Sequence, residues 1–276
     1  MSDLGQMHTI AHRVREHILA IAANPEGAHV GGSLSIADIL TVLYFDVMNL
    51  RPENPHWEER DYFILSKGHA SAALYSVLAE KGFLPTDELD QYARAGSRLA
   101  GHPLASVPGV EFPTGSLGHG LSLGAGLALA AKRDHRPNRA FVLLGDGELQ
   151  EGSVWEAVMA AAQYGLDNLV AIVDRNGLQI SGPTEQRMRL EPLAERWAAF
   201  GWHVRNIDGH DLEQLTRAFT EIPAAKGRPS VLIAHTIKGR GVSFLEGRKK
   251  AHYVTLSADL YARALADLNR ERGVKA

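Results

Sequence analysis

Short apolar runs alternate along the chain with longer stretches whose apolar residues recur at helical spacing. The runs that lack helical spacing, and therefore predict buried strands, lie at 61–65, 141–144, 169–173, 202–207 and 231–234. Helical patterns separate them, and others open the chain at 10–21 and close it around Leu260, Ala264 and Leu268. This alternation predicts an α/β fold, a doubly wound parallel sheet flanked by helices, in a single domain over residues 1–276.

Local signals predict several boundaries. Ser35 matches the first position of a capping box, which predicts a helix over 36–47. A glycine-rich turn is predicted around His29, just before that helix. Thr86 is predicted to cap another helix, and the polar stretch 181–191 is predicted to be irregular.

Two polar side chains follow neighbouring strands of the predicted sheet. Asp146, within Gly-Asp-Gly, follows the run at 141–144, and Asn176 follows the run at 169–173. Ligands of open parallel sheets bind at the carboxyl ends of strands, so we expect Asp146 and Asn176 side by side there. With the carbonyl of Leu178 they form an oxygen-only set of the kind that Mg²⁺ prefers. The alternative, a turn in which Asp146 caps a helix, is compatible with this prediction and leaves Asn176 unexplained.

Composition narrows the class of ligand. The chain has 276 residues, a net charge of −3 and no long block of Lys or Arg, which argues against nucleic acid or an anionic membrane as partner. Cysteine is absent, so disulfides, thiolate metal sites and cysteine nucleophiles are excluded. No apolar run reaches the roughly 18 residues of a membrane span, and the N-terminus lacks a signal-peptide core. We therefore expect a cytoplasmic protein that binds a small molecule.

Histidine recurs next to glycine at several predicted turns. His69 follows a predicted strand in Ser-Lys-Gly-His, His102 stands in Gly-His-Pro, and His119 precedes a predicted helix. Each of these is ordinary by itself, because histidine is common in turns that bind nothing. Lys238 and His252 lie in a later polar segment, for which a solvated basic loop is the competing interpretation.

Seven motifs join these observations, in the order AHVGGSLS, SKGHASAALY, GHP, TGSLGHGLSLGAGLALA, GDGELQEGSVWEA, DRNGLQISG and TIKGRGVSF. Together they resemble the amino-terminal, diphosphate-binding part of transketolase, and the match to the split type, in which that part is a separate subunit, is close. The resemblance implies a thiamine diphosphate-binding fold with thiamine diphosphate and Mg²⁺ or Ca²⁺ as cofactors. It also implies transfer of a two-carbon ketol unit from a ketose phosphate, or another ketose, to an aldose, with the cofactor supplying the carbanion chemistry.

The resemblance also implies roles for single residues. The implied catalytic residues are His29, His69, His102, His252 and Glu151. The residues implied to bind the cofactor are His69, Gly115, Leu117, Gly147, Glu151, Asn176, Ile180 and Lys238. The implied metal ligands are Asp146, Asn176 and the carbonyl of Leu178.

One of these residues has an alternative role that its local sequence explains, and at two positions the sequence differs from the family. The resemblance implies that His29 and His102 contact the reacting oxygens and that Glu151 communicates between paired sites of a dimer. Locally, Glu151 fits equally well as an acid in the first turn of a helix. The chain departs from the family around His252, where the family has Trp-His-Gly, and at His119, where it has glutamine.

The family's active site lies between two modules. The second module carries the glutamate that activates the cofactor and the arginines that hold the sugar phosphate, and no segment here matches it. We therefore expect a partner, the transketolase C-terminal (pyrimidine-binding) subunit, in an α₂β₂ assembly. Three alternatives stay open: the α subunit of another thiamine diphosphate enzyme (a 2-oxo acid dehydrogenase or a deoxyxylulose-phosphate synthase relative), a non-catalytic partner-binding homologue, and a Mg²⁺-dependent nucleotide binder. Against the nucleotide binder, the sequence contains neither a Gly-x-Gly-x-x-Gly turn nor a Walker Gly-Lys-Ser/Thr loop.

Overall fold

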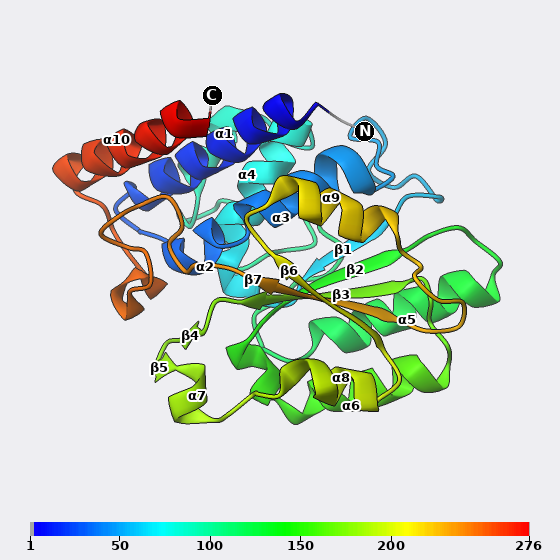
Figure 1. The fold of residues 1–276 in the computed structure, drawn as a ribbon. Coiled ribbons are helices and arrows are strands. Elements are labelled where there is room, and N and C mark those ends of the chain that lie inside the picture. Colours follow the sequence, from blue (N-terminus) through cyan, green and yellow to red (C-terminus); the bar gives the residue numbers. More distant parts are fainter. Residues whose placement is uncertain (1–2, 276) are drawn as a thin grey trace.

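A parallel β-sheet forms the centre of the fold (Figure 1). The computed structural model describes residues 3–275, without the side chains of residues 271, 272, 274 and 275. Within these residues the main sheet has five strands in the order β1-β2-β3-β7-β6, all paired in parallel. The strands are β1 (Tyr62–Leu65), β2 (Ala140–Gly145), β3 (Leu169–Arg175), β6 (His203–Asp208) and β7 (Ser230–His235).

Helices cover both faces of this sheet, which confirms the predicted doubly wound α/β fold (Figure 1). The helices on one face are α1 (Leu4–Ala22), α3 (Ala37–Val42), α4 (Ser71–Lys81) and α9 (Leu212–Thr220). The helices on the other face are α5 (Gly120–Arg133), α6 (Gly152–Gln163) and α8 (Leu193–Ala199). The closing helix α10 (Ala258–Lys275) lies along α1.

Strand β2 shows why the apolar runs lack helical spacing. Phe141 and Leu143 belong to the core on the α1 side of the sheet, whereas Val142 and Leu144 belong to the core on the α5 side. Successive strand residues point to opposite faces, so a strand covered on both faces is apolar throughout. Helix α5 packs closely on this strand: a Cβ added at Gly124 would lie only 2.3 Å from Cγ2 of Val142, so glycine allows the close approach.

The structure differs from the prediction around His29 and Ser35. His29 is the N-cap of a short helix, α2 (Val30–Leu34), instead of part of a turn. This helix is buried throughout, and helical backbone hydrogen bonds satisfy polar groups that a buried open turn would leave unpaired. Ser35 does not form a capping box, because α3 starts two residues later and the Ser35 hydroxyl donates to the carboxylate of Asp174 at 2.8 Å.

Other segments also depart from the predicted outline. The helix predicted over 36–47 ends as a π-helix, η1 (Leu43–Val47). Thr86 starts a 3₁₀-helix, η3 (Thr86–Gln91), and makes no side-chain cap. The stretch 181–191, predicted to be irregular, holds β5 (Gly182–Pro183), paired with β4 (Leu178–Gln179), and α7 (Thr184–Arg187). The remaining 3₁₀ turns are η2 (Gly68–Ala70), η4 (Gly147–Gln150) and η5 (Lys249–His252). Over residues 3–275 no helix is long and apolar enough to span a bilayer.

Candidate active site

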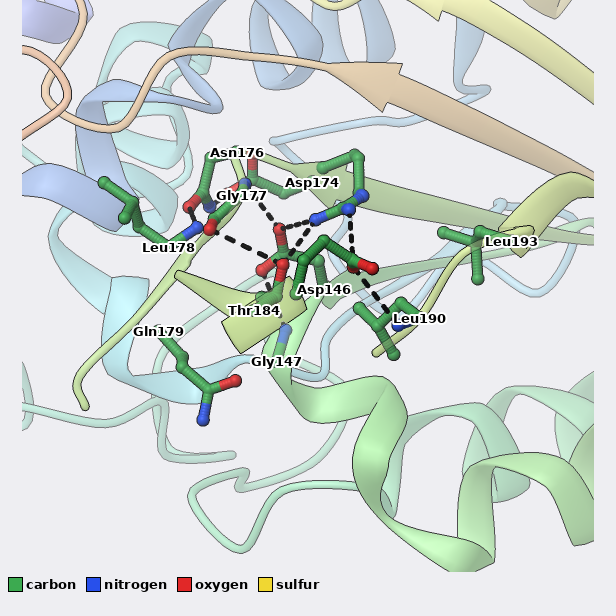
Figure 2. Close-up of polar contacts among 12 residues, drawn as sticks. Asp146, Gly147, Asp174, Asn176, Gly177, Leu178, Gln179, Thr184, Leu190 and Leu193 are labelled. Carbon is green, nitrogen blue, oxygen red and sulfur yellow. Dashed lines mark hydrogen bonds and ion pairs between the residues drawn. The ribbon is translucent and has the colours of Figure 1, made fainter. Parts of the chain in front are cut away.

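Asp146 lies at the carboxyl end of β2, where the metal site is predicted. It is 2% exposed and accepts hydrogen bonds from the amides of Gly147 at 2.7 Å and Gly177 at 2.6 Å (Figure 2). Arg175 Nη1 donates to the same carboxylate at 3.0 Å. Burial, followed by the nearby Asp174, raises the pKa of Asp146, and its hydrogen bonds oppose the rise. The N-cap interpretation holds as well, because the bond from Gly147 opens η4.

Asn176 and the carbonyl of Leu178 follow β3 at the same edge of the sheet, since Gly145 of β2 pairs with Asp174 of β3. Asn176 Oδ1 accepts from the Leu178 amide at 3.0 Å, and Asn176 Nδ2 donates to Asp174 at 2.9 Å (Figure 2). The Leu178 carbonyl accepts from Lys238 Nζ at 3.1 Å.

The donor chemistry of this edge fits a hard cation. A carboxylate, an amide oxygen and a backbone carbonyl suit Mg²⁺ or Ca²⁺, with diphosphate and water oxygens able to complete the shell. Among the described residues, no group of three or more His, Cys, Asp or Glu side chains could hold a metal. In the predicted donor set, Asp146 is the carboxylate that would bind an ion at this edge.

Imidazoles from four separate segments converge beside this edge, and we call His29, His69, His102 and His252 the histidine cluster. The ring centroid of His29 lies 5.3 Å from that of His69, 6.0 Å from that of His102 and 5.2 Å from that of His252. The rings of His69 and His252 are 5.3 Å apart. His252 thus joins the cluster despite its altered neighbours, and Tyr253 meets the His29 ring edge-on at 4.8 Å.

The surroundings of His29, His69 and His252 favour neutral imidazoles. Burial, followed by His102 and Lys238, lowers the pKa of His29 to about 4. Burial, followed by Lys238, lowers the pKa of His252 to about 4, and burial lowers the pKa of His69 well below 6.5. A neutral imidazole has one N–H donor and one acceptor nitrogen, so at pH 7 these rings can bind hydroxyl or carbonyl oxygens. His29 Nδ1 is buried without a hydrogen-bond partner among the described residues, which leaves a polar atom for a ligand.

Lys238 is buried, so its interpretation as part of a solvated basic loop is wrong. It is 3% exposed, and its Nζ lies 3.3 Å from Nδ1 of His252. Burial lowers its pKa. The loop turns there because Gly239 has φ +80°, and the Gly239 amide donates to the Gly31 carbonyl at 2.9 Å. The structure therefore brings both candidates from this segment to the site.

The glycine-rich segment 114–120 borders the histidine cluster. A Cβ at Gly115 would lie 3.4 Å from Cδ2 of His102, so the backbone here approaches the cluster closely. Leu117 is half-buried, and its carbonyl lies 3.0 Å from Nδ1 of the exposed His119. His119 thus caps its own loop and does not enter the cluster.

Of the other predicted residues, Glu151 and Ile180 lie farther out, whereas Gly147 lies next to Asp146. Glu151 is the exposed N-cap of α6 and makes no side-chain cap bond, and a Cβ at Gly118 would lie 2.7 Å from its Cβ. Ile180, at the tip of the β4–β5 hairpin, is 64% exposed and lies outside the buried part of the site. At Gly147 a Cβ would lie 2.9 Å from Cβ of Gln179, so only glycine fits between η4 and β4.

Sequence reasoning missed four buried polar residues behind the site, which are Ser66, Lys67, Glu148 and Asp174. Glu148 accepts from Ser66 Oγ at 2.5 Å and from the amides of Gly118 at 2.9 Å and Gly145 at 3.0 Å. It thereby joins the segment 114–120 to the ends of β1 and β2. In the sequence these residues are polar positions in or shortly after an apolar run. That position does not show which groups their side chains contact.

The parallel sheet, the strand-end carboxylate and amide, and the clustered imidazoles are typical of an α/β domain that binds a cofactor at the carboxyl edge of its sheet. A family model described as "Transketolase, thiamine diphosphate binding domain" matches residues 7–272. The chain therefore belongs to the transketolase family, and its fold is the thiamine diphosphate-binding fold. The match favours transketolase over the other thiamine enzymes and the nucleotide binder considered above.

Relatives agree with this assignment. The chain is 47% identical to an apulose-4-phosphate transketolase subunit of Phocaeicola vulgatus, over 92% of its own length and 91% of the relative's. It is 46% identical to the 6-deoxy-6-sulfo-D-fructose transketolase subunit SqwG of a Clostridium species, over 88% of its own length and 89% of the relative's. The solved transketolase from Leishmania mexicana superposes with a TM-score of 0.90 at 32% identity, covering 98% of this chain and 42% of that one. The chain thus spans less than half of that solved chain, and the predicted resemblance to the amino-terminal subunit of a split transketolase is confirmed.

Proposed function

We propose that this chain is the thiamine diphosphate-binding subunit of a transketolase that transfers a two-carbon ketol unit from a ketose to an aldose. It acts with a C-terminal (pyrimidine-binding) partner subunit in an α₂β₂ assembly and in the cytoplasm. The observation that carries the proposal is the convergence of the histidine cluster with Asp146 and Asn176 at one edge of the sheet. Relatives named as subunits support the partner, because the chain spans about nine tenths of their length.

The strand-end oxygens would hold the metal. Asp146, Asn176 and the carbonyl of Leu178 would bind Mg²⁺ or Ca²⁺, which would offset the charge of a diphosphate against a buried carboxylate. Lys238 adds a buried ammonium beside the same carbonyl. When bound, thiamine diphosphate supplies the carbon nucleophile and the electron sink of ketol transfer.

The imidazoles of this chain would handle the sugar. His29 and His102 are proposed to bind the hydroxyl and carbonyl oxygens of the substrate, with His69 and His252 on the inner side of the histidine cluster. His102 is exposed and His29 is partly buried, so the cluster leads from solvent into the site. The lowered pKa of His29, about 4, keeps its ring neutral at pH 7, so one ring nitrogen can accept a hydrogen bond from a substrate hydroxyl.

We further propose that the donor is an anionic ketose. Arg248, Lys249 and Lys250 are exposed and directly precede the buried Ala251 and the half-buried His252. Residues i and i+3 of a 3₁₀-helix share one side, so Lys249 and His252 share one side of η5. The two relatives described above are named for a 4-phosphate and a 6-sulfo sugar, which supports an anionic group on the donor.

The test is ketol transfer by the chain co-purified with its partner subunit, supplied with thiamine diphosphate, Mg²⁺ and a panel of phosphorylated, sulfonated and neutral ketoses. We expect turnover only with both chains and only with anionic donors. Robust turnover by this chain alone would contradict the need for a partner, and equal use of neutral ketoses would contradict the anionic donor.

A calorimetric titration tests the metal site directly. Asp146→Ala should abolish Mg²⁺-dependent binding of thiamine diphosphate while leaving the sheet folded, because the side chain sits beyond the end of β2. Asp87→Ala, which removes an exposed carboxylate of η3, is the matched control and should bind as the wild type does. Unchanged cofactor affinity in Asp146→Ala would remove this residue from the site.

A further inference from the structure

Asp174, near the end of β3, is 0% exposed and accepts four hydrogen bonds from four different segments. Its Oδ2 accepts from Lys67 Nζ at 2.6 Å, Ser35 Oγ at 2.8 Å and Asn176 Nδ2 at 2.9 Å. Its Oδ1 accepts from the hydroxyl of Thr236. We call these five residues the Asp174 cluster. No predicted catalytic or cofactor role includes Asp174, Lys67, Ser35 or Thr236.

Each donor of the Asp174 cluster is close in the chain to a residue of the candidate site. Ser35 ends the α2 segment that His29 begins, and Lys67 precedes His69 by two residues. Thr236 precedes Lys238 by two residues. Only a group that presents several acceptor lone pairs at one point can hold so many donors, and an ionised carboxylate is such a group.

Lys67 makes the cluster a buried ion pair. It is 2% exposed, and its ammonium also donates to the carbonyl of Gly32 at 2.6 Å. A buried charge whose partner is removed is strongly destabilising, so Lys67 and Asp174 depend on each other. Replacing both charges removes that penalty and separates the stability of the pair from any role in the site.

The bond to Asn176 fixes the direction of its side-chain amide. A carboxylate only accepts, so the Asn176 nitrogen must face Asp174, and the Leu178 amide only donates, so it must face the Asn176 oxygen. If the amide were flipped, the Asn176 oxygen would face the Asp174 carboxylate, and the Asn176 nitrogen would face the Leu178 amide, so neither pair could form a hydrogen bond. Asp174 therefore determines that the Asn176 oxygen is turned toward the Leu178 side, where the metal site is proposed.

We propose that Asp174 is the positioning residue of this site: through the Asp174 cluster it orients the Asn176 oxygen for the divalent cation and holds the His29, His69 and Lys238 segments together. This inference rests on the proposed function for its metal and cofactor. Groups that orient metal ligands typically contribute 10- to 100-fold to metal affinity, and we expect an effect of that size.

The test uses the full chain with Asp174→Asn and with the double variant Lys67→Met/Asp174→Asn. Mn²⁺ affinity in the presence of thiamine diphosphate is measured by titration, and stability by the melting temperature. Asp174→Asn should lower both. The double variant should regain much of the melting temperature, because no unpaired charge remains, yet its Mn²⁺ affinity should stay at least about tenfold below the wild type. Recovery of both together, or wild-type Mn²⁺ affinity in Asp174→Asn, would overturn the proposal.

A readout without ligand separates this inference from the proposed function. In the ligand-free chain, hydrogen exchange of the Leu178 amide should quicken at least about tenfold in the double variant, because its acceptor Asn176 is no longer held. Amides of β2 should keep their protection. Unchanged hydrogen exchange at Leu178 in the double variant would overturn the positioning role, whatever the chain binds. If exchange quickens but the wild type binds no Mn²⁺, the positioning of Asn176 stands, and both the proposed function and the metal part of the inference are contradicted.

Thr236→Val gives a milder test that keeps the ion pair. It removes one donor of the Asp174 cluster and should weaken thiamine diphosphate binding severalfold by freeing the Lys238 loop. Thr41→Val is the matched control, since among residues 3–275 the buried Thr41 hydroxyl bonds only within α3, to the Ala37 carbonyl at 2.8 Å. Equal cofactor affinity in the two variants would contradict the role of Thr236 in holding the Lys238 segment at the site.

Discussion

Acid should destabilise this protein through the histidine cluster, and replacing two of its members should reduce that sensitivity. The folded-state pKa values of His29 and His252 are about 4, below the ordinary 6.5. Between those values the unfolded chain binds more protons than the folded chain. The stability that depends on neutral imidazoles is therefore present above about pH 6.5 and is lost as the pH falls toward 4.

The expected size follows from the two pKa values. For one such imidazole, linkage gives a loss of about 2 kcal/mol in the free energy of unfolding between pH 7 and pH 5. Both rings are partly exposed, so solvent screening should reduce this to about 1 kcal/mol each, or about 2 kcal/mol for His29 and His252 together. Other groups that titrate in this range are shared by wild type and variant, so their contributions cancel in the difference.

Urea unfolding at pH 7, 6 and 5 measures that difference. Between pH 7 and pH 5 the double variant His29→Gln/His252→Gln should lose about 2 kcal/mol less than the wild type. His56→Gln, a substitution of an exposed histidine outside the site, should follow the wild type. Parallel pH dependence of the wild type and the double variant would refute the conclusion that folding holds these imidazoles neutral.

Three further substitutions test the packing around the site. Gly124→Ala should lower the free energy of unfolding by about 1–3 kcal/mol in urea titrations, because its Cβ would lie 2.3 Å from Val142 Cγ2. His210→Ala removes the imidazole that accepts from the Ile237 amide at 2.8 Å, and should increase proteolysis of the following loop. Glu148→Gln should cost about 1–3 kcal/mol by calorimetry, because its amide group would face donors that now share a carboxylate. An unchanged free energy of unfolding in Gly124→Ala or Glu148→Gln, or unchanged proteolysis in His210→Ala, would contradict the role given to that contact.

Much of the fold could be predicted because burial on both faces of a parallel strand leaves a continuous apolar run. The run at 141–144 became β2 of the sheet for that reason, and the position of Asp146 after it placed the carboxylate at the ligand-binding edge. Local rules worked less well where tertiary contacts compete with them. Ser35 has the spacing of a helix cap, but the buried carboxylate of Asp174 binds its hydroxyl instead.

The sequence by itself determined the strands of the main sheet, the polar residues at the strand ends and the resemblance to transketolase, because periodicity and motif spacing are properties of the chain alone. Only the tertiary structure decided that His252 joins His29, that Lys238 is buried and that Asp174 ties the segments of the site together. The physical reason is that burial and hydrogen-bond partners depend on residues far apart in the chain. Lys67 and Asp174, 107 positions apart, form one buried ion pair that neither local stretch could predict.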